Sequence, residues 1–135
     1  MAKGYIYEHV ITPHDVTTHS IAYDESYIDW ACTARERMIV EHLESPPRYF
    51  VGETYVRYLT PAYLYDRVEI RVAVGDHNVE KGRVRLDFRF SNKGSSQMLA
   101  EGYQIIFFHD FDSGKRISIP EEFLKLLDIG TVEEL

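Results

Sequence analysis

Residues 15–37, DVTTHSIAYDESYIDWACTARER, contain a polar loop that runs into a segment with apolar residues at helical spacing. The residues that share one helical face are Tyr27, Trp30, Ala31, Ala34, Met38 and Ile39. The segment starts near Tyr23, with acidic side chains in its first turns, where they stabilise the positive end of a helix dipole. Ser45-Pro46-Pro47 cannot continue a helix. The stretch therefore predicts one long helix from Tyr23 to near Leu43.

On both sides of this helix the sequence alternates between apolar and polar residues, as strands with one buried face do. The predicted strands cover residues 5–11, 49–59, 67–74, 83–90 and 98–109, and a short helix, EEFLKLL, follows at 121–127. GDHNVEKG at 75–82 and SNKGSS at 91–96 are predicted turns. One strand, one helix and four further strands form an α+β layout. We expect a curved antiparallel sheet wrapped around a single central helix.

Composition narrows the class of protein. The chain has 135 residues, 44% hydrophobic and 27% charged, which suffices for one domain, 1–135, with its own core. A formal net charge of −7 argues against nucleic acid as a partner, because phosphate backbones require a basic patch. The absence of a signal-peptide core and of any membrane-spanning stretch predicts a cytoplasmic protein. A long helix on one sheet layer leaves surfaces for further copies, so we expect a homodimer or homotetramer.

Cysteine and histidine usage gives little sign of metal or thiol chemistry. The lone Cys32 lies within the helical pattern, where a small buried thiol is a commoner interpretation than a nucleophile. The six histidines are scattered without the spacing of metal ligands. The sequence predicts no metal and no cofactor.

Several short segments, taken in order, resemble one known family over nearly the whole chain. They are His14-Asp15-Val16-Thr17, Tyr23, Tyr27-Ile28-Asp29-Trp30, Ala34-Arg35, Leu59-Thr60-Pro61, Asp66-Arg67-Val68, Leu99 to Gln104, and Gly114-Lys115 through Pro120. Their order and spacing resemble the hot-dog fold thioesterases related to 4-hydroxybenzoyl-CoA thioesterase, and most closely those of enediyne polyketide pathways. The resemblance implies a hot-dog fold and hydrolysis of an acyl-CoA or acyl-carrier-protein thioester with an aryl, fatty or polyketide acyl group.

The chain departs from this family at the residue that matters most for its chemistry. The 4-hydroxybenzoyl-CoA type has a catalytic aspartate where this chain has Thr17, and Asp15 lies two residues earlier. In the enediyne type that position is asparagine, and a helix tyrosine and arginine are implicated instead; these correspond to Tyr27 and Arg35. The family also has a glycine where this chain has Ser20.

The resemblance places an oxyanion donor at the backbone N–H near Asp24, at the helix N-terminus. The candidate bases are then Asp15, Asp24 and His19, of which only His19 has an unperturbed pKa near neutrality. Alternatively, Thr17 only positions the water. The candidate substrate-binding residues are Tyr23, Trp30, Tyr55 and Tyr58. An acyl tunnel between sheet and helix is expected to be lined by Tyr49, Phe50, Tyr55 and Tyr58.

Each candidate also has a simpler interpretation. Asp24 suits the first turn of any helix, and Tyr27 and Trp30 lie on the apolar face. Arg35 could reach a neighbouring subunit, a helix partner such as Asp29 or a substrate carboxylate, and its simpler interpretation is a surface ion pair. A second class of function is a non-hydrolytic hot-dog module that binds an acyl ligand or a partner protein. Dehydratases of this architecture resemble a different pattern, with a histidine and an acid on the helix, and residues 24–40 contain no histidine.

Overall fold

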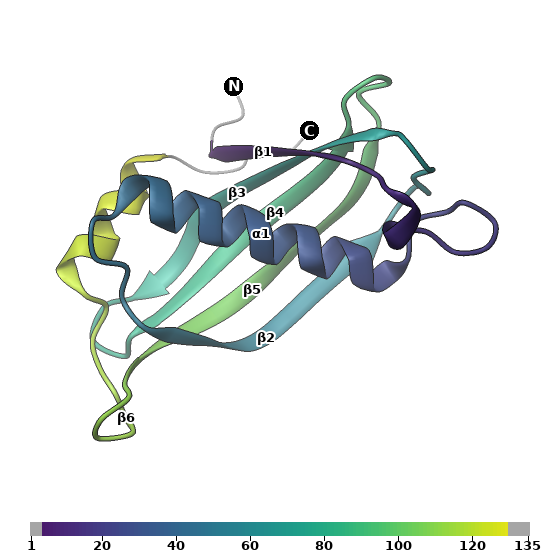
Figure 1. Cartoon of the computed structure of the whole chain (residues 1–135). Coiled ribbons are helices and arrows are strands. Elements are labelled where there is room, and N and C mark those ends of the chain that lie inside the picture. The colour runs from purple at the N-terminus through teal and green to yellow at the C-terminus, as the bar shows by residue number, and fades with distance from the viewer. Residues whose placement is uncertain (1–3, 130–135) are drawn as a thin grey trace.

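The computed structural model describes residues 4–129, which form one curved sheet with one long helix across it (Figure 1). The elements in chain order are β1 (Tyr5–Val10), the short 3-10 helix η1 (Pro13–Asp15), α1 (Asp24–His42), β2 (Tyr49–Tyr58), β3 (Arg67–Asn78), β4 (Arg83–Asn92), β5 (Met98–Asp110), β6 (Lys115–Arg116) and the 3-10 helix η2 (Glu121–Ile129). The sheet is antiparallel in the order β1-β3-β4-β5-β2, and β6 pairs with β5. The predicted α+β layout is confirmed.

Helix α1 buries the face that the sequence predicted. Every apolar residue assigned to that face is buried, and two small residues, Ala31 and Ala34, have almost no exposed surface. The helix begins and ends within one residue of the predicted bounds. Polar Ser26 and charged Arg35 are buried on the same side, which apolar periodicity did not indicate. The apolar stripe therefore positions two polar side chains against the sheet.

All five predicted strands are present in the predicted order, but their ends do not all match. Residues 75–78 belong to β3 rather than to a turn, because an irregularity between Val74 and His77 lets the ladder with β4 continue past Gly75. The predicted C-terminal helix is a 3-10 helix, and the two-residue strand β6 was not predicted.

The sheet has an apolar face toward α1 and a charged face away from it. The core is formed by the inward side chains of β3, β4 and β5 with α1, and includes Val72, Leu86, Phe90 and Phe108. Ion pairs such as Arg71–Glu69 and Arg85–Asp87 lie on the opposite face. Within residues 4–129, no helix combines the length and apolar character needed to span a membrane.

Candidate active site

A cavity of about 310 Å³ lies at the first turn of α1. Its wall is formed by Ile21, Ala22, Asp24, Tyr27, Tyr58, Leu59, Thr60 and Pro61. The loop before the helix is tied to the segment after β2, because the Ala22 amide donates to the Ala62 carbonyl at 2.9 Å and the Leu64 amide donates to the Ser20 carbonyl at 3.0 Å. The fold thus brings together three of the predicted site residues, Asp24, Tyr27 and Tyr58.

Backbone donors are available at this end of the helix. The amides of Asp24 and Glu25 donate to no acceptor within residues 4–129, and the Tyr23 side chain provides no cap. The Tyr58 hydroxyl donates to the Asp24 carbonyl at 2.8 Å, which ties β2 to the first turn. Since the helix dipole is positive here, this wall of the cavity favours negative charge.

Tyr27 lines the cavity and has 3% of its surface exposed. Its ring makes edge contacts with Tyr58 at 5.1 Å and Phe90 at 5.4 Å. Burial, with smaller contributions from Tyr58 and Asp66, raises the pKa of Tyr27 to about 12. Its hydroxyl has no hydrogen-bond partner among the described residues. At neutral pH it is therefore a protonated donor and is free to bind a ligand oxygen.

Asp15 is occupied by structural hydrogen bonds. Its Oδ2 accepts from the Thr12 amide at 2.8 Å, from the Thr12 hydroxyl at 3.0 Å, and from His9 Nε2 at 2.8 Å. Burial alone would raise the pKa of Asp15, but these hydrogen bonds outweigh it and hold the pKa below its usual value. The Asp15 carbonyl also accepts from the Ser26 hydroxyl at 2.9 Å. The Asp15 carboxylate therefore ties the loop to β1, the Asp15 carbonyl ties it to α1, and Asp15 does not line the cavity.

Thr17 and His19 form a turn outside the cavity wall. Thr17 Oγ1 accepts from the His19 amide at 3.2 Å, and the Ser20 amide donates to the Thr17 carbonyl at 2.9 Å. The His19 side chain is exposed. Ser20 has a φ of 63°, so it adopts the left-handed backbone that glycine adopts most easily. The replacement of the family's glycine by Ser20 therefore leaves a turn of that shape in place.

Two predicted substrate-binding residues lie near the site but not in it. Tyr23 precedes the helix with 39% of its surface exposed. Trp30 is buried in the core, 5.1 Å from the His9 ring and 4.7 Å from the Tyr27 ring, measured between ring centres. Its Nε1 has no acceptor among the described residues. The simpler interpretation of Trp30, core packing, is the one that its burial favours.

Arg35 lies eleven residues beyond Asp24, about 16 Å along the helix axis, and does not line the cavity. It is buried, with 8% of its surface exposed, and it forms an ion pair with Glu36, whose side chain is 56% exposed. Its NH1 donates to Gln104 Oε1 at 2.6 Å and its Nε donates to Glu36 Oε2 at 3.2 Å. Cys32 lies beside it and is partly exposed, not buried as expected. Gln104 was missed because it interrupts an apolar strand face at one position only.

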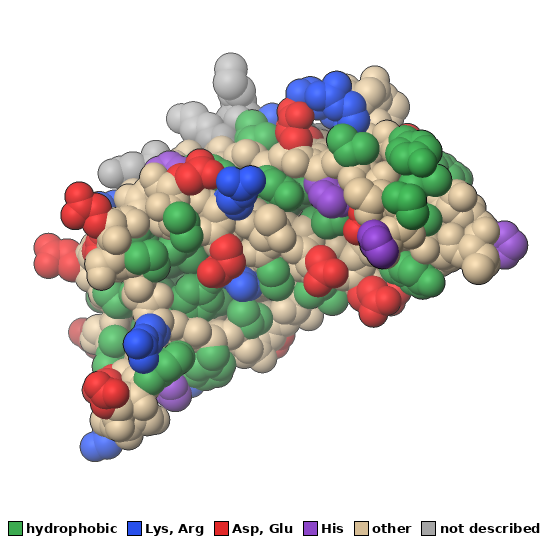
Figure 2. Space-filling view, viewed as in Figure 1, with side chains coloured by type: hydrophobic (Ala, Val, Ile, Leu, Met, Phe, Trp, Pro, Cys, Tyr) green, Lys and Arg blue, Asp and Glu red, His purple; other side chains and the backbone are tan. Residues whose placement is uncertain are grey.

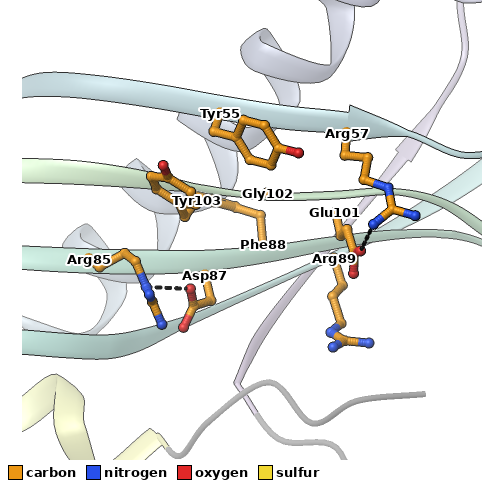
Figure 3. A pocket seen from close by; sticks show the side chains of 9 residues that line it. All are labelled: Tyr55, Arg57, Arg85, Asp87, Phe88, Arg89, Glu101, Gly102 and Tyr103. Carbon is orange, nitrogen blue, oxygen red and sulfur yellow. Dashed lines mark ion pairs between the residues drawn. The ribbon is translucent and has the colours of Figure 1, made fainter.

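Tyr55 lies on the face of the sheet away from α1 (Figure 3). Its ring stacks on that of Tyr103 at 5.4 Å, beside a separate hollow of about 340 Å³ that contains the ion pair of Arg85 and Asp87. Phe50 pairs with outward Phe107. The expectation that Phe50 and Tyr55 line a tunnel on the helix side is therefore wrong.

Phe50 points outward because it follows inward Tyr49 along the strand. Tyr55 points outward because of an irregularity in β2 between Val51 and Glu53. An extra residue in a strand reverses which side chains point inward beyond it. Tyr49 before the bulge and Tyr58 after it both face α1, although strict alternation would place them on opposite faces.

Among the described residues, no group of three or more His, Cys, Asp or Glu could hold a metal ion.

Solved structures share this architecture. A 1,4-dihydroxy-2-naphthoyl-CoA thioesterase from Synechocystis has 16% identity and a TM-score of 0.81 over 92% of this chain and 95% of that chain. A Staphylococcus aureus protein in complex with CoA has 13% identity and a TM-score of 0.85 over 100% and 91%. The dynemicin thioesterase has 18% identity and a TM-score of 0.80 over 96% and 99%. At these identities the likeness defines the fold, which is the hot-dog fold.

The sequence itself gives the family. Residues 11–127 match the profile of the thioesterase-like superfamily, and the chain belongs to that superfamily. None of the curated proteins matches the sequence. Fold and family together make the chain a hot-dog fold member of the thioesterase-like superfamily.

Proposed function

We propose that this protein hydrolyses the thioester of an acyl-CoA or acyl carrier protein in the cavity at the N-terminus of α1. The observation that carries the proposal is the meeting, at one cavity, of unpaired helix amides, the Asp24 carboxylate and the free hydroxyl of Tyr27. Membership of the thioesterase-like superfamily supports the reaction. CoA in the complex of one structural neighbour supports CoA as the carrier.

The first-turn amides of α1 and the Tyr27 hydroxyl act as donors to the thioester carbonyl oxygen. When water attacks the carbonyl carbon, negative charge develops on that oxygen, and preorganised donors at a helix N-terminus stabilise it. Tyr27 keeps its proton at neutral pH, because its pKa is about 12. Tyr58 holds the first turn in place through the Asp24 carbonyl.

Asp24 is the base in this proposal. Of the three predicted bases, it alone lines the cavity, because the Asp15 carboxylate is engaged by Thr12 and His9, and His19 lies in the outer turn. Its carboxylate takes a proton from the attacking water and returns it to the leaving thiolate when the tetrahedral intermediate collapses. In this proposal Thr17 stabilises the turn before the helix and takes no part in the reaction.

The test measures thiol release from aryl, fatty and polyketide thioesters of CoA and of phosphopantetheine. We expect hydrolysis of at least one class, with kcat reduced about 100-fold in Tyr27→Phe and in Asp24→Asn. Asp24→Asn keeps the backbone amide and removes only the base. Tyr103→Phe, on the far face of the sheet, is the control and should retain wild-type kcat. Unchanged kcat in both site variants would contradict the assignment.

The alternative function is a module that binds an acyl ligand without hydrolysing it. Thr17 at the position of the family's aspartate, and the engagement of Asp15 by three hydrogen bonds, favour it. Absence of thiol release from the whole panel, together with measurable binding of the same ligands, would support this alternative.

We also propose a single domain, which the one continuous core supports, and a homodimer or homotetramer. The exposed edge strand β2 supports association, because unpaired strand edges are sites of pairing.

A further inference from the structure

Beside α1, the edge strand β2 carries a strip of partly exposed side chains, with a cavity at each end. The inward side chains of β2 are Tyr49, Val51, Thr54, Val56 and Tyr58, and none of them is fully buried. On the helix side, Ile28 is 38% exposed and Cys32 is partly exposed. Hydrophobic side chains are visible on this side of the molecule (Figure 2). The candidate active-site cavity lies at the Tyr58 end of this strip, and a second cavity, lined by Arg35 and Tyr49, lies at the other end.

Arg35 forms a buried polar pair with Gln104, which lies opposite Thr54 of β2. Arg35 is 8% exposed and Gln104 is 1% exposed, and they are joined by the 2.6 Å hydrogen bond from NH1 to Oε1. Gln104 is the one polar side chain among the inward positions of β5, which are otherwise Ala100, Gly102, Ile106 and Phe108. A hydrophobic pair of similar volume would fill this space without the cost of removing a charge from water. Packing alone therefore does not account for the pair.

The surroundings of Arg35 determine the ligand chemistry that it fits. Arg35 lines a cavity of about 320 Å³ with Tyr49 and Val51. Glu36 accepts hydrogen bonds from both Arg35 and Tyr49 and largely balances the guanidinium charge. A carboxylate ligand would be repelled by Glu36, whereas a hydroxyl or keto oxygen can accept from the guanidinium without a charge conflict.

We propose that Arg35 is a specificity residue that binds a hydroxyl or keto oxygen on the distal part of the acyl group. Gln104 is a positioning residue, because it fixes the guanidinium through NH1. The helical rise from Asp24 to Arg35 is about 16 Å. A long acyl chain with its carbonyl at the helix N-terminus reaches Arg35 if it lies against the partly exposed side chains of β2 beside α1. The inference rests on the proposed function and adds to it the substrate class, long acyl groups with a distal neutral oxygen.

The experiment compares CoA thioesters of equal length with a distal methyl, hydroxyl, keto or carboxylate group. For the wild-type protein we expect kcat/KM to be about tenfold higher for the hydroxyl or keto substrate than for the methyl substrate. In Gln104→Leu this ratio should fall to near one. A loss of folded protein lowers the apparent kcat/KM for both substrates by the same factor, so it does not change their ratio. Gln104→Glu keeps an acceptor for Arg35 and should keep the preference.

The control is Ile106→Val, two residues along the same inward face, which perturbs packing without touching Arg35. Its ratio should match that of the wild type. A wild-type ratio near one, a preference for the carboxylate, or equal ratios in wild type and Gln104→Leu would overturn the inference.

The inference and the proposed function can fail separately. If no thioester is hydrolysed, the proposed function fails, and the same comparison is made as dissociation constants of unreactive thioether analogues by calorimetry. A tenfold preference for the oxygen-bearing analogue that disappears in Gln104→Leu would then still support the specificity site. Equal dissociation constants would reject it.

Discussion

Two aspartates near the start of α1 illustrate how residues of one type acquire different roles. Asp15 accepts hydrogen bonds from Thr12 and His9, whereas Asp24 is exposed at the cavity wall. A general base must be free to exchange protons with water, so hydrogen bonding decides which of the two aspartates can act as one. At this scale the local environment determines the role of each side chain.

Removal of the Asp15 carboxylate should destabilise the protein in a pH-dependent way. Because the folded-state pKa of Asp15 is below its usual value, the carboxylate contributes stability above about pH 4, and this contribution is lost as pH falls through the folded pKa. We expect Asp15→Ala to lower the free energy of unfolding by about 2 kcal/mol at pH 7. Urea unfolding at a series of pH values should show the difference shrinking in acid. A pH-independent difference would contradict this, and exposed Asp29→Ala is the control.

The Tyr58 hydroxyl should matter more for turnover than for stability. Tyr58→Phe removes the 2.8 Å hydrogen bond to the Asp24 carbonyl, which costs about 1 kcal/mol at most at a site that is 45% exposed. Loss of this tie loosens the first turn of α1, so we expect kcat/KM to fall about fivefold. Steady-state kinetics checks this against Tyr55→Phe, three residues earlier on the opposite face, which should have no effect.

At the scale of elements, irregular backbone decides where side chains point. The bulge in β2 brings both Tyr49 and Tyr58 to the helix side, and the left-handed Ser20 closes the turn before α1. The apolar periodicity of α1 and of β3 to β5 was predictable, because each of these elements buries one face. The bulge was not, since exposed β2 has no apolar alternation that would reveal a change of register.

Two glycines with positive φ allow a matched test of turn packing. Gly82 has a φ of 63°, and an added Cβ would lie 1.8 Å from the Ile117 carbonyl oxygen. Gly114 has a φ of 71° with open space around it. We expect Gly114→Ala to cost about 1 kcal/mol from backbone strain alone and Gly82→Ala to cost at least twice as much. Thermal unfolding of both variants measures this, and equal costs would show that the β3–β4 turn moves away from Ile117 freely.

At the scale of the whole molecule, each of the two outer strands of the sheet, β1 and β2, has one edge that pairs with no other strand among the described residues. Edge strand β2 carries exposed apolar side chains, among them Val51 at 37% and Tyr55 at 47%. Such an edge is suited to contact with a second copy of the chain. The sequence-based expectation of a homodimer or homotetramer stays a prediction, and the fold provides a surface for it.

Sedimentation equilibrium should give the mass of a dimer or a tetramer of the 15.8 kDa chain. Val51→Glu places a charge on the edge strand and should shift the protein toward the monomer. Val79→Glu, at the β3–β4 turn and 41% exposed, should leave the mass unchanged. A monomeric wild-type protein would refute the expected association, and an unchanged mass in Val51→Glu would place the contact elsewhere.

The sequence by itself determined the order of elements, the buried face of α1 and the family, because periodic apolar residues report burial directly. It also placed the candidate site at the loop before the helix. Only the tertiary structure separated Asp24, Tyr27 and Tyr58 from Asp15, Thr17 and His19, and it alone paired Arg35 with Gln104. The hydrogen bonds between Tyr58 and Asp24 and between Arg35 and Gln104 join residues far apart in the chain, and hydrogen bonds of that kind leave no periodic trace in the sequence.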